Sequence, residues 1–172
     1  MIHITDGTVL SEGKEFRWDI LIKDGKIAYA GPDAAEVLSR MDVADVSVID
    51  ASGKYVSPGF IDIHTHGGAG ADFMDGSMEA YRTALHLHTS HGTTLIYPTT
   101  LTGAKDSLLE SVKSYQEIKA SGISGAEMGG LHFEGPYFAY SKKGAQDSRE
   151  ACQADDMLIN PAYLYAALRN IL

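Results

Sequence analysis

Pro58-Gly59-Phe60-Ile61-Asp62-Ile63-His64-Thr65-His66-Gly67-Gly68-Ala69-Gly70 is the stretch that decides the fold. It predicts a buried strand from Gly59 to Thr65 that ends in two histidines and then breaks into glycines, which permit a sharp turn. Because side chains alternate along a strand, His64 and His66 are expected to share a face, with Asp62 one step below them. Parallel α/β folds bind ligands at such strand ends, so the two imidazoles are expected to be able to bind one ion together. Two hydrogen-bonded core histidines are the alternative interpretation.

Composition narrows the class of protein. The chain has 172 residues, of which 44% are hydrophobic and 22% charged, as is ordinary for a soluble globular protein. Its net charge is -9 and it has no run of Lys or Arg, so no nucleic acid is expected as a partner. No apolar run approaches a membrane span, and the single cysteine, Cys152, forms no internal disulfide. We therefore expect a cytoplasmic protein without a membrane partner.

Residues 1–57 have the pattern of a small β domain. Apolar strands over 18–23 and 26–30 flank Asp24-Gly25, a pair that favours a type I′ hairpin turn. A helical turn is expected within 33–42. Strands this short bury little surface alone, so we expect a β-sandwich-like unit that packs on another part of the protein.

Strand and helix patterns alternate in the second predicted domain, residues 58–172. After the His-x-His strand they predict a helix over 77–91 that Ser77 caps, a strand over 93–100, a helix over about 105–120, a strand over 129–137 and a helix over 163–172. This alternation is typical of a parallel sheet with right-handed crossovers.

Glu134 follows the third of these strands and is expected to meet His64 and His66. Two imidazoles and a carboxylate suit zinc or a similar ion, and three protein ligands with an open position mark a catalytic site. Metal-assisted hydrolysis is the reaction class that this set implies. A carboxylate paired with a lysine such as Lys142 is the alternative for Glu134. His132, on the same face, is expected to support the site rather than bind the ion.

The remaining polar groups are interpreted as structural. His86, His88 and His91 lie on one predicted helix without a carboxylate or cysteine to complete a ligand set, and we expect them to face solvent. Asp72 and Asp75 are expected to cap or turn the loop after the glycines.

Four stretches carry a resemblance to a known family. The His-x-His stretch after a small β unit resembles the amidohydrolase superfamily, whose metal lies inside a (β/α)8 barrel. Three further stretches are Gly70 to Asp75, His91 to Thr94 with Pro98 to Thr100, and Leu131 to Tyr137 followed by Lys143-Gly144-Ala145. Together they resemble the N-acetylglucosamine-6-phosphate deacetylase family.

The resemblance implies a set of roles. Glu134 matches the metal-binding glutamate of the family, and His64 and His66 match its histidine pair, so one or two divalent ions (Zn, Fe or Mn) are implied. Ala145 and Gln146 fall where the family contacts the phosphorylated amino-sugar substrate. The implied activity of the intact protein is removal of the acetyl group from that sugar, and a homodimer is implied.

Length is the main departure from the family. A (β/α)8 barrel takes about 250 residues, and only its first three βα units are visible here. The family's proton-shuttling aspartate and further metal-binding histidines have no counterpart in this sequence, so the chain is interpreted as a truncated barrel that is inactive alone. Another amidohydrolase, of hydantoinase or D-aminoacylase type, and a non-catalytic product that needs a partner chain are the alternatives.

Overall fold

The computed structural model describes residues 1–147 and 149 in two compact units. The units are Met1–Pro58 and Gly59–Leu172, which places their division one residue from the predicted boundary. Cys152 and the helix predicted over 163–172 lie outside the described residues. No helix in the described part of the chain combines the length and the apolar surface needed to cross a membrane.

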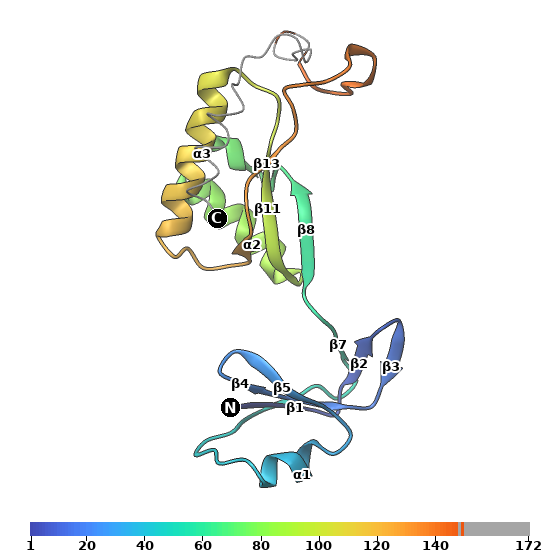
Figure 1. The fold of residues 1–172 in the computed structure, drawn as a ribbon. Coiled ribbons are helices and arrows are strands. Elements are labelled where there is room, and N and C mark those ends of the chain that lie inside the picture. Colours follow the sequence, from blue (N-terminus) through green and yellow to red (C-terminus); the bar gives the residue numbers. More distant parts are fainter. Residues whose placement is uncertain (148, 150–172) are drawn as a thin grey trace. The chain divides into compact units, whose positions relative to one another are not determined.

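The first unit contains two small sheets and one short helix (Figure 1). The sheets are β5(Lys26–Gly31)-β4(Asp19–Lys23)-β1(Ile2–Thr5)-β6(Ser47–Asp50) and β3(Lys14–Phe16)-β2(Thr8–Ser11)-β7(Tyr55–Val56), and the helix is α1 (Ala34–Ser39). The predicted hairpin is confirmed, because β4 and β5 pair antiparallel around Asp24 and Gly25. Both turn residues have positive φ angles, 52° and 73°, as a type I′ turn requires.

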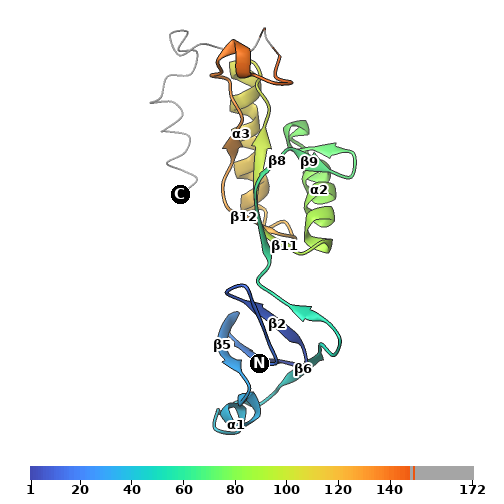
Figure 2. The same ribbon diagram turned by 90° about the vertical axis from the view of Figure 1, so that its right-hand side faces the viewer.

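The second unit is a parallel α/β sheet covered by helices. β11 (Thr93–Thr100) pairs in parallel with β8 (Phe60–Thr65), β12 (Glu127–Met128) and β13 (His132–Phe133). The helices α2 (Met78–Ser90) and α3 (Lys105–Ala120) lie on the same side of the strands in Figure 1, and Figure 2 shows them next to β8 and β11 from the side. The predicted alternation of strands and helices is therefore confirmed through the third strand.

A small hairpin connects β8 to α2. It consists of β9 (Gly67–Gly68) and β10 (Ala71–Asp72), followed by the 3₁₀ turn η1 (Phe73–Asp75), and a second 3₁₀ turn, η2 (Tyr140–Lys142), follows β13. The predicted capping is confirmed: Asp72 Oδ1 accepts from Met74 N at 2.8 Å, and Asp75 Oδ2 accepts from Asp72 N at 2.9 Å. These two carboxylates thus fix the loop that leaves the His-x-His strand.

Two predictions about the strands were wrong. The His-x-His strand was expected to be buried, yet Phe60, Ile61 and Ile63 are 65%, 62% and 68% exposed. The reason is that β8 pairs only with β11 among the described residues. Of the strand predicted over 129–137 only β13 forms, and β12 lies just before that range. Between β12 and β13 the Tyr97 ring lies against the backbone: a Cβ at Gly129 would come within 2.7 Å of Tyr97 Cζ.

The helices are held to the sheet by one apolar core. Its buried members come from both helices and from β11, β12 and their connections: Phe73, Tyr81, Ala84, Leu85, Ile96, Tyr115, Ile118, Ala126 and Met128. At the start of α2, Ser77 Oγ accepts from Ala80 N at 3.1 Å, which confirms the predicted cap.

Two tyrosines in this core differ in what their hydroxyls contact. Tyr115 donates to the Met128 carbonyl at 3.2 Å, while Tyr81 has no hydrogen-bond partner among the described residues. Burial raises the pKa of Tyr115 to about 12 and also raises that of Tyr81, so both phenols remain protonated at neutral pH. Only the Tyr115 hydroxyl therefore contributes a bond to the fold.

Tyr115→Phe is expected to lower the free energy of unfolding by about 1–3 kcal/mol, because it leaves the buried Met128 carbonyl without this donor. Tyr81→Phe removes a hydroxyl that has no partner and is expected to leave stability unchanged or raised. Urea denaturation of the full chain followed by circular dichroism compares the two variants. An equal loss of unfolding free energy in both variants would contradict the conclusion that only the Tyr115 hydroxyl contributes a hydrogen bond to the fold.

Candidate metal centre

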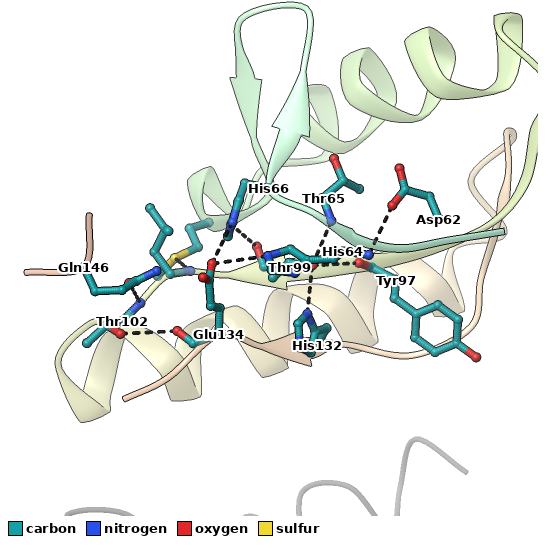
Figure 3. Close-up of polar contacts among 12 residues, drawn as sticks. Asp62, His64, Thr65, His66, Tyr97, Thr99, Thr102, His132, Glu134 and Gln146 are labelled. Atoms are coloured by element: carbon teal, nitrogen blue, oxygen red, sulfur yellow. Dashed lines mark hydrogen bonds and ion pairs between the residues drawn. The ribbon is translucent and has the colours of Figure 1, made fainter. Parts of the chain in front are cut away.

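Three side chains converge at the carboxyl end of the parallel sheet (Figure 3). His64 and His66 come from the end of β8, and Glu134 comes directly after β13; one ligand atom from each lies within 4.8 Å of the others. Glu134 Oε2 is 3.0 Å from His66 Nε2 and 3.3 Å from His64 Nε2. The structure thus brings together the three residues that the sequence marked as ligands.

Strand register explains the convergence. β11 lies between the two ligand-bearing strands, with Pro98 opposite Thr65 on one side and Thr99 opposite His132 on the other. In a parallel sheet, residues at the same height on neighbouring strands leave the sheet at the same edge. The two histidines and the glutamate, which follow these positions directly, therefore emerge side by side.

The proton on His66 is fixed by the backbone of β11. His66 Nδ1 lies 3.2 Å from the Thr99 carbonyl, which accepts only, so Nδ1 carries a hydrogen. In the neutral ring Nε2 is then an unprotonated acceptor that faces a carboxylate oxygen 3.0 Å away. Two acceptors so close need a proton or a metal cation between them, and the donor set of two nitrogens and one oxygen suits a divalent ion.

Asp62 was expected one step below the two histidines on their face, and it does not lie beside their imidazoles. Between Asp62 and Thr65, β8 uses three steps where β11 uses two, from Ile96 to Pro98. This β-bulge changes which side chains share a face. The Asp62 carboxylate consequently lies outside the cluster of ligand atoms: its Oδ1 accepts from the His64 backbone N at 3.1 Å, as Figure 3 shows, and its Oδ2 lies 3.8 Å from His88 Nδ1.

His88 is also placed differently from the prediction. It was expected to face solvent, but its side chain is only 19% exposed. Its Nε2 lies 3.0 Å from the Gly67 carbonyl and 3.3 Å from Thr65 Oγ1, because α2 packs behind the end of β8. His86 and His91, predicted in the same way, are exposed. His88 therefore holds the turn that follows the ligand histidines.

The predicted substrate-contact residues lie in the segment after β13. Ala145 is exposed, whereas Gln146 is buried, with its side-chain oxygen accepting from Thr102 N at 2.9 Å. Thr102 Oγ1 in turn donates to the Glu134 carbonyl at 3.2 Å. Gln146 is thus connected through one residue to the backbone of the glutamate ligand.

Sequence reasoning missed the threonines at the end of β11. Thr99 contacts the backbone of β8 and the His132 ring, and Thr102 links Glu134 to Gln146. In the sequence Thr99 belongs to the β-branched run of residues 93–100, which was interpreted only as strand propensity, and Thr102 lies two residues beyond that run. A hydroxyl at the carboxyl end of a central strand was the available signal.

Known proteins resemble this chain over most of its length, although no family model matches it. The N-acetylglucosamine-6-phosphate deacetylase of Lysinibacillus sphaericus is 33% identical over 151 residues, 86% of this chain and 36% of the relative. The protein of that name from Bacillus subtilis (strain 168) is 32% identical over 147 residues, 83% of this chain and 34% of the relative. The chain thus spans about a third of the length of these relatives.

Solved structures agree in fold. The N-acetylglucosamine-6-phosphate deacetylase from Pasteurella multocida has a TM-score of 0.77 at 24% identity and covers 99% of this chain and 42% of its own. A D-hydantoinase from Bacillus sp. AR9 has a TM-score of 0.50 at 26% identity and covers 82% of this chain and 28% of its own. In sequence and in fold, the chain is homologous to the N-terminal portion of the N-acetylglucosamine-6-phosphate deacetylases of the amidohydrolase superfamily.

Proposed function

We propose that the intact protein carrying this chain hydrolyses the acetamide of N-acetylglucosamine 6-phosphate to glucosamine 6-phosphate and acetate. The observation that carries the proposal is the convergence of His64, His66 and Glu134 at one sheet edge, in a chain homologous to deacetylases of this name. The hydantoinase alternative receives less support, since the TM-score falls from 0.77 to 0.50.

His64, His66 and Glu134 are proposed to hold one or two divalent cations, with zinc, iron and manganese as the candidates. When bound, such a cation polarises a substrate carbonyl and activates water for attack. The chain's own contribution is to orient the ligands: the Thr99 carbonyl holds the proton on His66 Nδ1 and leaves Nε2 free to bind. The exposed fraction of the side chains, 46% for His64 and 33% for His66, leaves the site open to a ligand.

Ala145 and Gln146 are proposed to lie at the amino-sugar contact. The side-chain oxygen of Gln146 already accepts from Thr102 N, so we assign its amide nitrogen as the donor to substrate. Lys143 Nζ donates to the Gln146 carbonyl at 2.5 Å, which supports the backbone of this contact.

The parallel sheet is proposed to form the start of a (β/α)8 barrel, whose remaining strands supply the proton-shuttling aspartate. For that reason we expect the 172-residue chain alone to release no acetate. The homodimer and the cytoplasmic location stay predictions, and so does the choice of metal.

Acetate release by the intact protein, as its native cell produces it, tests the proposal. The protein is stripped with a chelator and reloaded with zinc, iron or manganese, and it is then given N-acetylglucosamine 6-phosphate. A hydantoin and an N-acyl-D-amino acid serve as comparison substrates. N-Acetylgalactosamine 6-phosphate is a third, because a relative from Escherichia coli O157:H7 is named N-acetylgalactosamine-6-phosphate deacetylase. We expect metal-dependent release from the glucosamine derivative. No release with any of the three metals would refute the function.

Size-exclusion chromatography tests the remaining alternative, a non-catalytic product that requires a partner chain. That alternative predicts that the protein purified from its native cell elutes together with a second polypeptide. We expect no second polypeptide in the active fraction.

A further inference from the structure

Thr99 has an unusual position in the described part of the second unit. It is fully buried on β11, between the strand that carries His64 and His66 and the strand that precedes Glu134. Its side chain contacts neither the imidazole of His66 nor the carboxylate, yet it touches groups on both strands. Thr99 can therefore influence the distance between the two histidines and Glu134.

The hydroxyl of Thr99 uses its whole hydrogen-bonding capacity. Oγ1 accepts from Thr65 N at 3.0 Å, donates to the Tyr97 carbonyl at 3.1 Å and lies 3.3 Å from His132 Nδ1. A hydroxyl has one hydrogen and two lone pairs, so with Tyr97 as acceptor, Thr65 N and His132 Nδ1 are the two donors. The carbonyl of the same residue accepts from His66 Nδ1.

From these contacts we propose that Thr99 is the positioning residue of the metal centre. Its side chain fixes the backbone of β8 between His64 and His66, and its carbonyl fixes the tautomer of His66. The proposal rests on the metal site of the proposed function. It adds a role for a residue that binds neither metal nor substrate.

The β8 bulge makes the hydroxyl necessary. Opposite Pro98 the strand register shifts, and the amide of Thr65 finds its acceptor in the Thr99 side chain. Without that oxygen a part-buried N–H between the two ligand histidines loses its partner, which favours a backbone shift at this point. A shift of the amide between His64 and His66 moves both imidazoles.

His132 extends the same arrangement to the third ligand strand. Its ring lies edge-on to the ring of His64, with centroids 4.8 Å apart. The Thr99 hydroxyl holds His132 through Nδ1, so the aromatic contact keeps His64 from rotating away from Glu134. Thr99 thus acts on His64 from two directions, through the backbone of Thr65 and through His132.

Four variants of the intact protein test the proposal. Thr99→Val keeps the shape and removes the hydroxyl, Thr99→Ser keeps the hydroxyl, and Thr99→Ala lacks both the hydroxyl and the methyl group. Thr100→Val is the matched control, because Thr100 is the next buried residue of β11 and its Oγ1 has no partner among the described residues. The probe is zinc alone, whose affinity is measured by competition with a chromophoric chelator. The visible spectrum of the cobalt(II)-loaded protein reports the coordination geometry.

We expect Thr99→Val to weaken zinc binding by about 10- to 100-fold, the usual effect of losing a group that orients a metal ligand. Its cobalt spectrum should change in shape as well. Thr99→Ser and Thr100→Val should bind zinc as the unchanged protein does. If Thr99→Val does not fold, the zinc affinities of Thr99→Ser and Thr99→Ala are compared, since these two variants differ only in the hydroxyl. We then expect Thr99→Ala to bind zinc more weakly than Thr99→Ser.

Equal zinc affinity in the unchanged protein and in Thr99→Val would overturn the role of Thr99 and leave the metal site standing. So would a loss of thermal stability without a change in affinity or spectrum. An unchanged protein that binds no zinc, iron or manganese would overturn the proposed metal site itself, and the role of Thr99 with it.

Discussion

Glu134→Gln is expected to reduce the divalent-metal affinity of the intact protein by more than about 100-fold, beyond the loss usual for an orienting group. The amide keeps the size of the side chain but removes the negative charge that lies 3.0 Å from His66 Nε2 and 3.3 Å from His64 Nε2. The ligands that this chain still supplies are then two neutral imidazoles, which hold a dication more weakly because they do not balance its charge. Acetate release should fall with metal content.

Glu127→Gln is the control for this variant. Glu127 is an exposed carboxylate on β12, the other strand that pairs with β11 on the side of Glu134. Metal content measured by atomic emission after dialysis should be unchanged in Glu127→Gln and nearly abolished in Glu134→Gln. Full metal content in both variants would show that Glu134 is not a ligand.

Gly135→Ala is expected to destabilise the second unit by about 2–5 kcal/mol, the sum of a left-handed backbone and an overpacked contact. Gly135 has a φ angle of 105°, which L residues rarely adopt. A Cβ there would lie 2.2 Å from Thr102 Oγ1 and 2.6 Å from Phe138 Cε2. Since Thr102 donates to the Glu134 carbonyl, any movement that relieves the contact also displaces the ligand.

Gly144→Ala separates the effect of the left-handed backbone from the effect of the overpacked contact. Gly144 also has a positive φ angle, 61°, but a Cβ there would meet nothing within 4 Å. It should cost only the backbone part, about 1–2 kcal/mol. Thermal unfolding of the metal-free protein ranks the variants, and a loss in Gly144→Ala as large as in Gly135→Ala would mean that the crowding at Thr102 has no effect.

Local patterns predicted much of this structure. The Asp24-Gly25 hairpin, the Ser77 cap, α3 and the alternation of strands with helices depend on residues close in sequence, so periodicity and turn chemistry are sufficient. Convergence of the three ligands was predictable for the same reason. Each follows a strand of one parallel sheet, and the ends of such strands meet at one edge.

Features that depend on contacts between distant segments were not predictable. The bulge in β8 arises from its pairing with β11, and no residue between Asp62 and Thr65 marks it. Likewise, the Tyr97 ring lies against Gly129, 32 positions along the sequence, where the chain passes from β12 to β13 without regular pairing. His88 has the sequence neighbours of a surface residue, and only the packing of α2 behind β8 assigns it to the turn.

The bulge in β8 also determines the charge balance of the ligand site. A regular strand would have placed Asp62 on the same face as His64 and given the site two carboxylates, enough to neutralise a dication. Because Asp62 turns toward His88, the described ligand set carries the single negative charge of Glu134. A bound divalent ion would therefore leave an excess of one positive charge. For these three ligands alone, that excess favours an anionic group beside the ion.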